Sequence, residues 1–321
     1  NFEIAMDNSY KDVESHSAYV KFKVKGTASE YFVAWTTTPW TLPGNVGLAV
    51  NPKADYVLVE SNGEQLWFAK DLVPIDLKVL KTVKGTELVG LTYEPLFNFL
   101  PVGNQKSYVV VAADFVTLDD GTGIVHTAAI YGEDDYVLSV KEGLPTIPML
   151  DDQGKFLDFV TPLAGQFYAK TQEWIINGLM KRGLMFKSTT TSHSYPFCYR
   201  CGTALYYNAI PAWFINIQKI KPELIKQNES IAWYPDFLKY GRFGKGLETA
   251  PDWNISRSRY WGTPMPIWIG DKTGKIRVIG STGELENWST GVLPPLTDIH
   301  REFIDDLTIY VDDERTEVGH R

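Results

Sequence analysis

The segment WTTTPWTLPGN, residues 35–45, gathers four threonines, two tryptophans and two prolines and contains no charged residue. Threonine presents a methyl group and a hydroxyl group within a small volume. A pocket lined by these side chains could contact an apolar group with methyls and hold a ribose or a water molecule with hydroxyls. The candidate lining residues are Thr36, Thr37, Thr38 and Thr41.

A second segment, GTGIVHTAAIYGEDDY at residues 121–136, combines a glycine-rich turn, a histidine and an acidic cluster. Glycines such as Gly123 allow a ligand to approach the backbone closely. His126 ends an apolar strand, and Asp135 offers a carboxylate that can hold an amine. Together the two segments indicate a pocket for a small, amino-bearing, sugar-linked substrate.

Each candidate also has a structural explanation. Threonines are common strand formers, and a lone histidine after an apolar strand is commonly a satisfied core residue. Asp135, like Glu133 and Asp134, can be an early-helix acid that interacts with the helix dipole. The residue types alone leave both explanations open.

The two cysteines, Cys198 and Cys201, have the CxxC spacing of half a four-cysteine zinc site or of a redox pair. No second CxxC occurs, and His193 is the nearest possible third ligand. The alternatives are two reduced thiols in a turn and a zinc half-site completed by chain outside this sequence.

The sequence contains no GxSxG elbow, Walker loop or HExxH motif, and its glycine cluster lacks the spacing of a dinucleotide site. No side chain is an obvious nucleophile or strong general base. We therefore expect a positioned water to attack, helped by backbone groups, threonine hydroxyls and a ribose hydroxyl.

Composition indicates a soluble globular chain, with 44% hydrophobic and 22% charged residues among 321. No apolar run approaches the roughly 20 residues of a bilayer span, and the first residues do not resemble a signal peptide. We expect no membrane partner and a cytoplasmic protein or fragment. A formal charge of −8 argues against broad nucleic-acid coating but permits a local groove for a single-strand end.

Hydrophobic patterning predicts the elements that position these residues. Alternating segments separated by Gly, Pro and Asn predict a β-rich block to about residue 127. Helices are predicted over residues 132–143 and about 170–182, followed by glycine in each case. The expected class is α+β, a β-barrel-like domain with peripheral helices.

The residue pattern of the sequence changes near residue 217, and we place a domain boundary there. The expected parts are a leading linker (1–17), the β-rich domain (18–217) and a final segment (218–321) with a hairpin at 269–280.

The two opening segments resemble the signature segments of the editing domain of isoleucyl-tRNA synthetases, in the class I aminoacyl-tRNA synthetase family. The resemblance continues in SYPFCYRCGTALYYNAIPAWF, GRFGKGLE and DWNISRSRYWGTPMPIW and covers all but the termini. Thr38 and Trp40 stand where valine- and leucine-specific relatives carry arginine and an acid. The His-Ile-Gly-His and Lys-Met-Ser-Lys-Ser motifs are absent, which suggests an editing insertion without the synthetic site.

The resemblance implies hydrolysis of valine wrongly esterified to the 3′ end of isoleucine tRNA. Thr37, Thr38, His126 and Asp135 would form the catalytic set, with His126 as the wall that excludes isoleucine and an ionised Asp135 holding the α-ammonium. Substrate contacts would come from Trp35, Thr36, Thr41, Asn45 and Gly123.

The resemblance further implies a monomer that needs no cofactor for editing. ATP would bind only at the missing synthetic site, and Cys198 and Cys201 would be half of a structural zinc site. Two alternatives remain open: a valine-type editing domain that hydrolyses threonyl esters of valine tRNA, and a non-catalytic module that docks a tRNA end.

Overall fold

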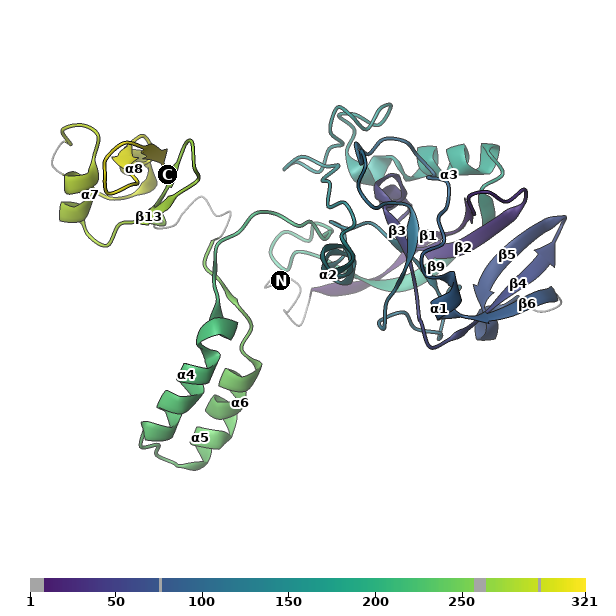
Figure 1. Cartoon of the computed structure of the whole chain (residues 1–321), viewed down its shortest axis with the longest axis horizontal. Coiled ribbons are helices and arrows are strands. Elements are labelled where there is room, and N and C mark those ends of the chain that lie inside the picture. The colour runs from purple at the N-terminus through teal and green to yellow at the C-terminus, as the bar shows by residue number, and fades with distance from the viewer. Residues whose placement is uncertain (1–8, 75–76, 257–263, 294–295) are drawn as a thin grey trace. The chain divides into compact units, whose positions relative to one another are not determined.

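The computed structural model describes residues 9–74, 77–256, 264–293 and 296–321. Contacts between residues divide the chain into two compact units, Asn1–Ala209 and Ile210–Arg321 (Figure 1). The division after Ala209 lies a few residues before the domain boundary that we placed near residue 217 from the sequence pattern.

The first unit contains a nine-stranded sheet that curls into a half-barrel (Figure 1). Its main path has the order β6-β4-β5-β2-β8-β3-β7, and β1 pairs with both β2 and β9. The strands are β1 (Tyr10–Lys23), β2 (Glu30–Thr36), β3 (Gly47–Val50), β4 (Asp55–Ser61), β5 (Glu64–Ala69), β6 (Lys78–Lys84), β7 (Val109–Ala112), β8 (Ile124–Thr127) and β9 (Met185–Pro196).

Strand β2 packs against apolar side chains on both faces. Phe32 and Ala34 belong to the large core of the unit, whereas Val33 belongs to a smaller core with Phe68 and others. Alternate residues of a strand point to opposite faces, and a strand buried on both faces cannot slip by one residue without exposing apolar groups. The threonine segment that follows β2 therefore starts from a fixed register.

The helices of the first unit confirm the predicted α+β class. They are η2 (Pro39–Gly44), η3 (Lys70–Leu72), α1 (Gly85–Leu88), α2 (Glu133–Glu142), η4 (Tyr168–Lys170) and α3 (Gln172–Lys181). Helices α2 and α3 confirm the two predicted helices. Gly143 and Gly183 follow them with φ of 68° each, a left-handed conformation that glycine adopts without strain.

Strand β9 was not predicted from the sequence. Its segment MFKSTTTSHSYP lacks a clear apolar alternation. It forms because β1 offers a long antiparallel partner, with a register from Tyr10–Pro196 to Val20–Met185.

The second unit begins with paired helices and a two-stranded ladder. Its elements are β10 (Phe214–Ile215), α4 (Ile217–Ser230), α5 (Phe237–Tyr240), α6 (Arg242–Thr249) and β11 (Trp253–Asn254). The sequence did not predict α4, a mostly polar helix in which the Asn216 side chain accepts from the Lys219 backbone N–H. Within the described residues, no helix is long and apolar enough to cross a membrane.

A four-stranded sheet with the order β13-β12-β15-β14 follows. Its elements are β12 (Ile267–Gly270), β13 (Ile276–Val278), α7 (Thr282–Trp288), α8 (Arg301–Ile304), β14 (Ile309–Tyr310) and β15 (Val318–His320). The antiparallel pairing of β12 with β13 confirms the predicted hairpin.

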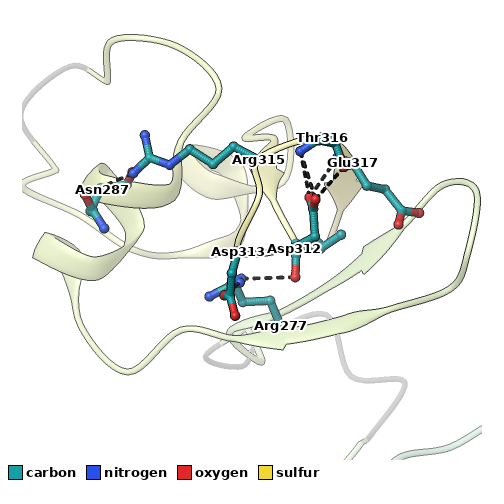
Figure 2. Close-up of polar contacts among 8 residues, drawn as sticks. Arg277, Asn287, Asp312, Asp313, Arg315, Thr316 and Glu317 are labelled. Atoms are coloured by element: carbon teal, nitrogen blue, oxygen red, sulfur yellow. Dashed lines mark hydrogen bonds and ion pairs between the residues drawn. The ribbon is translucent and has the colours of Figure 1, made fainter.

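Two carboxylates tie the turns of this sheet together. Asp312 accepts hydrogen bonds from the backbone N–H groups of Thr316 (2.9 Å) and Glu317 (2.7 Å), as Figure 2 shows. Glu317 in turn accepts from the backbone N–H groups of Lys272 (2.9 Å) and Thr273 (2.7 Å). We call Asp312 and Glu317 the carboxylate clasp, because together they join the β12–β13 turn to the turn before β15.

Candidate active site

Strand pairing brings the two candidate segments together. Strand β8 lies between β2 and β3, with Trp35 in parallel register with Val125 and Leu48 opposite His126 in antiparallel register. The carboxyl end of β2 and the amino end of β3 therefore both lie near the carboxyl end of β8. Helix η2 connects them there, which places its side chains against His126.

Both ring nitrogens of His126 are hydrogen-bonded. Nε2 lies 2.9 Å from Thr41 Oγ1, and Nδ1 lies 2.9 Å from Asn45 Nδ2. The same Asn45 nitrogen donates to the Gly47 carbonyl at 2.8 Å, and the Tyr93 hydroxyl donates to Asn45 Oδ1 at 2.7 Å. These contacts form a continuous buried chain from Tyr93 to Thr41.

The Gly47 carbonyl sets the direction of every proton in this chain. A carbonyl oxygen only accepts, so the amide nitrogen of Asn45 must face it, and His126 Nδ1 must accept from that nitrogen. The His126 proton is therefore on Nε2 and is donated to Thr41. The Thr41 hydroxyl then donates its own proton to the Thr38 carbonyl at 2.8 Å.

His126 is consequently neutral and has no free nitrogen. The residue is 7% exposed, and burial lowers its pKa from 6.5 to about 4. It cannot take a proton from water without breaking these bonds, which agrees with the expectation that no side chain of the site is a strong general base. The geometry is that of a rigid wall.

The remaining threonines lie at the end of β2 and in the two residues that connect it to η2. The Thr38 backbone N–H donates to Thr36 Oγ1 at 3.1 Å, and the hydroxyls of Thr36 and Thr38 are 3.3 Å apart. Thr36 is buried, whereas Thr37 and Thr38 are half-buried. Thr37 and Thr38 are thus the hydroxyls of the segment that retain access to a ligand.

Trp40 anchors η2 in the core. Its ring is 3% exposed and lies 5.0 Å from the ring of Tyr131, 4.6 Å from that of Tyr168 and 5.9 Å from that of Tyr206. Tight aromatic packing of this kind holds the neighbouring backbone rigidly. The threonine segment is therefore braced by a core residue rather than by solvent-exposed contacts.

Asp135 lies in the first turn of α2, and its carboxyl group is largely enclosed by protein. Its Oδ2 accepts a long hydrogen bond, 3.4 Å, from the backbone N–H of Ala128, two residues after His126. Burial raises the pKa of Asp135 from 3.8 to about 7. The bond from Ala128 opposes this rise, and the nearby charge of Asp134 adds to it. No cationic side chain of the described residues contributes to that pKa.

The helix dipole therefore does not set the pKa of Asp135, which burial raises above its usual value. The dipole is worth at most about 2 kcal/mol, and the cost of enclosing a carboxylate without a cation exceeds it. The exposed residues Glu133 and Asp134 are the acids that face the solvent at this helix end. Asp135 is left as an enclosed acceptor without a counter-ion.

Two predicted substrate contacts lie away from this cluster. Trp35 points to the opposite face of β2 from Thr36, and its ring centroid is 6.3 Å from that of Tyr19. Gly123 is buried against Ala69, where a side chain would clash, and its carbonyl accepts from the Tyr56 hydroxyl at 2.6 Å. The structure therefore gives both residues packing roles.

The two cysteines form a turn outside the threonine–histidine cluster. Gly202 N–H donates to the Cys198 carbonyl at 2.8 Å, and the Cys201 thiol donates to Thr203 Oγ1 at 3.2 Å. Among the residues that the structure describes, no group of three or more potential ligands could hold a metal. These thiols supply at most half of a tetrahedral zinc site.

Tyr93 is a site residue that the sequence did not reveal. It is fully buried in the segment GLTYEPLF, 48 positions from Asn45, and burial raises its pKa well above 10. No motif or periodicity in that segment marks a polar role. Only the folded chain shows that the Tyr93 hydroxyl donates a hydrogen bond to the side-chain oxygen of Asn45.

Comparison with known proteins places the chain in a family. Residues 1–318 match the tRNA synthetases of class I (I, L, M and V). The chain belongs to this family. The sequence is 49% identical over 304 residues to the isoleucine–tRNA ligase of Clostridium novyi, and 46% identical over 303 residues to that of Thermoplasma volcanium.

These class I relatives are much longer than the chain. The alignments cover 94% and 93% of this chain but 29% of each relative. Among solved structures, the editing domain of Plasmodium knowlesi cytosolic leucyl-tRNA synthetase matches 60% of this chain and all of its own at 14% identity and a TM-score of 0.43. The structure of GlLeuRS-CP1 matches 55% of this chain and 99% of its own, with 15% identity and a TM-score of 0.43.

Proposed function

We propose that this chain is the proofreading hydrolase of an isoleucyl-tRNA synthetase and cleaves the valyl ester of isoleucine tRNA. The observation that carries the proposal is the pairing of a locked, neutral His126 with an enclosed Asp135 that lacks a counter-ion. His126 limits the size of the amino-acid side chain, and Asp135 receives the α-ammonium of the esterified amino acid.

A second site of this kind is useful because a binding pocket can discriminate between similar amino acids only to a limited extent. A pocket that accepts isoleucine cannot strongly reject valine, because one methylene is worth about 1 to 3 kcal/mol, a limit for which isoleucyl-tRNA synthetases are themselves the standard example. A second, smaller site can reject the larger isoleucine by steric clash. A wall fixed by two hydrogen bonds suits that task, because it cannot move aside cheaply.

The chemistry proposed for this site is attack by a positioned water on the ester carbonyl. Asp135 holds the ammonium and so fixes the carbonyl beside it, while Thr37 and Thr38 orient the water or the ribose. The proton of the water passes to the departing ribose oxygen, helped by the neighbouring ribose hydroxyl. His126 and Thr41 take no part in proton transfer, since their protons are already committed.

Incubation of the protein with charged tRNAs tests this proposal. Release of valine from valyl-charged isoleucine tRNA is expected. Binding without release would instead identify a docking module, and preferred release of threonine from threonyl-charged valine tRNA would identify a valine-type editing site. A cytoplasmic location and a monomeric state form part of the same proposal.

A further inference from the structure

We infer that Gly132 is a positioning residue for Asp135, because the missing side chain at Gly132 is what lets the Asp135 carboxylate reach back toward Ala128. The inference rests on the proposed function, in which Asp135 holds the α-ammonium of the ester. It adds a residue that touches no substrate and acts only through Asp135.

The backbone at Gly132 does not require glycine. Gly132 is the N-cap of α2, with φ −152° and ψ 143°, an extended conformation that any residue adopts. No side chain caps the helix at this position, although serine, threonine, asparagine and aspartate are the preferred N-cap residues. Glycine is also accepted at N-caps, so neither the backbone nor the cap requires a missing side chain here, and the constraint on a side chain comes from a neighbouring group.

That constraint is the carboxyl group of Asp135. A Cβ atom at Gly132 would lie 3.0 Å from Asp135 Oδ2, 3.2 Å from its Cγ and 3.4 Å from its Cβ. The first two separations are tighter than ordinary van der Waals contact, so a methyl group would push the carboxyl away. The three nearest atoms to that methyl all belong to Asp135.

The displacement matters because the position of Asp135 is held by one weak bond. The hydrogen bond from Ala128 N–H is already 3.4 Å long, at the limit of such contacts. Movement by a few tenths of an ångström breaks it and frees the carboxylate to turn toward solvent beside Asp134. An ammonium held by a displaced carboxylate no longer aligns the ester, and small misplacements of this kind reduce rates by up to about a hundredfold.

A double-mutant cycle tests this inference on the intact protein. In the wild-type background, Gly132→Ala should lower kcat/KM for the valyl ester about fivefold to twentyfold, mainly through kcat, because the ester is misaligned. In the Asp135→Asn background the same change should have almost no further effect, since the methyl has no carboxylate to displace. Gly178→Ala in α3 is the matched control, because a Cβ there meets nothing within 4 Å.

Thermal unfolding should show Gly132→Ala to be folded and at most about 1 kcal/mol less stable than the wild type, because alanine adopts this backbone conformation but is a poorer N-cap than glycine. Losses that multiply across the two backgrounds, or no loss in Gly132→Ala, would overturn the inference while leaving the proposed function intact. A proposed function that fails shows itself differently, by a wild-type protein that releases no valine from valyl-charged isoleucine tRNA.

Discussion

At the scale of single residues, the contacts of His126 fit the steric role that we propose for it. Its two nitrogens are bonded to Thr41 and Asn45, and burial lowers its pKa to about 4. The ring is neutral across the physiological range. In the proposed function it is therefore the volume of the ring, rather than its basicity, that acts on the substrate.

Replacement of this wall by a smaller residue should change specificity. His126→Ala should hydrolyse correctly charged isoleucyl tRNA while still hydrolysing the valyl ester, because space opens for the extra methylene. The variant should also lose about 1 to 3 kcal/mol of unfolding free energy, since Thr41 and Asn45 lose buried partners. Deacylation assays with both esters measure the first effect, and a variant that still spares isoleucine would show that another group excludes it.

Asp135 should be the side chain on which the rate depends most. Asp135→Asn keeps the size of the group but loses a charge-assisted bond worth about 1.5 to 3 kcal/mol. We expect deacylation at least about tenfold slower, with little change in the Glu133→Gln control, whose side chain is exposed. A normal rate in Asp135→Asn would place the ammonium elsewhere, with Asp134 the first candidate.

The pKa of Asp135 gives this prediction a pH signature. Folding raises the pKa from 3.8 to about 7, so the folded state binds the extra proton and stability falls as pH rises from about 4 to 7. At pH 8, Asp135→Asn should be more stable than the wild type by up to about 4 kcal/mol, and at pH 4 by almost nothing. Hydrolysis by the wild type should rise as pH passes through about 7, a step that the variant lacks.

At the scale of elements, local signals predicted the helices and missed the strand that depends on a distant partner. Helices α2 and α3 carry their own stop signals in Gly143 and Gly183. Strand β9 has no comparable signal, because its polar segment becomes a strand only by pairing with β1. The meeting of the two signature segments likewise depends on β8 pairing with β2 and β3, which no single segment specifies.

The carboxylate clasp of the four-stranded sheet should make that sheet sensitive to acid. Hydrogen bonds from Thr316 and Thr273 lower the pKa values of Asp312 and Glu317 respectively. Their contribution is therefore present above about pH 4, the range of unperturbed carboxyl groups, and is lost as pH falls through the lowered values. The protection of residues 267–270 and 318–320 against hydrogen exchange, relative to the intrinsic exchange rate at each pH, should fall on acidification before that of β2.

An amide at position 312 is the test of this prediction. In Asp312→Asn, exchange in the sheet should already be fast at neutral pH and should respond less to acid. Glu302→Gln serves as an exposed control outside the clasp. Equal acid responses in the wild type and Asp312→Asn would assign the sensitivity to other groups.

At the scale of the whole molecule, the chain spans 29% of the length of the relatives it matches and forms two units, one of which holds the candidate site. Thr38, His126 and Asp135 could be named as candidate site residues from the sequence because they lie in recognisable segments. The bond from Tyr93 to Asn45 and the closeness of Gly132 to Asp135 could not be predicted, since these contacts are made only in the folded chain. The protonation of Asp135 also depends on enclosure that no local pattern encodes.

The ratio of deacylation rates on valyl- and isoleucyl-charged isoleucine tRNA tests the central claim most directly. A steric wall at His126 predicts rapid release of valine and release of isoleucine slower by at least about a hundredfold, equivalent to about 2.7 kcal/mol of discrimination. Both esters carry the same ammonium and ribose, so only the side-chain pocket can separate them. Equal rates on the two esters would contradict the account.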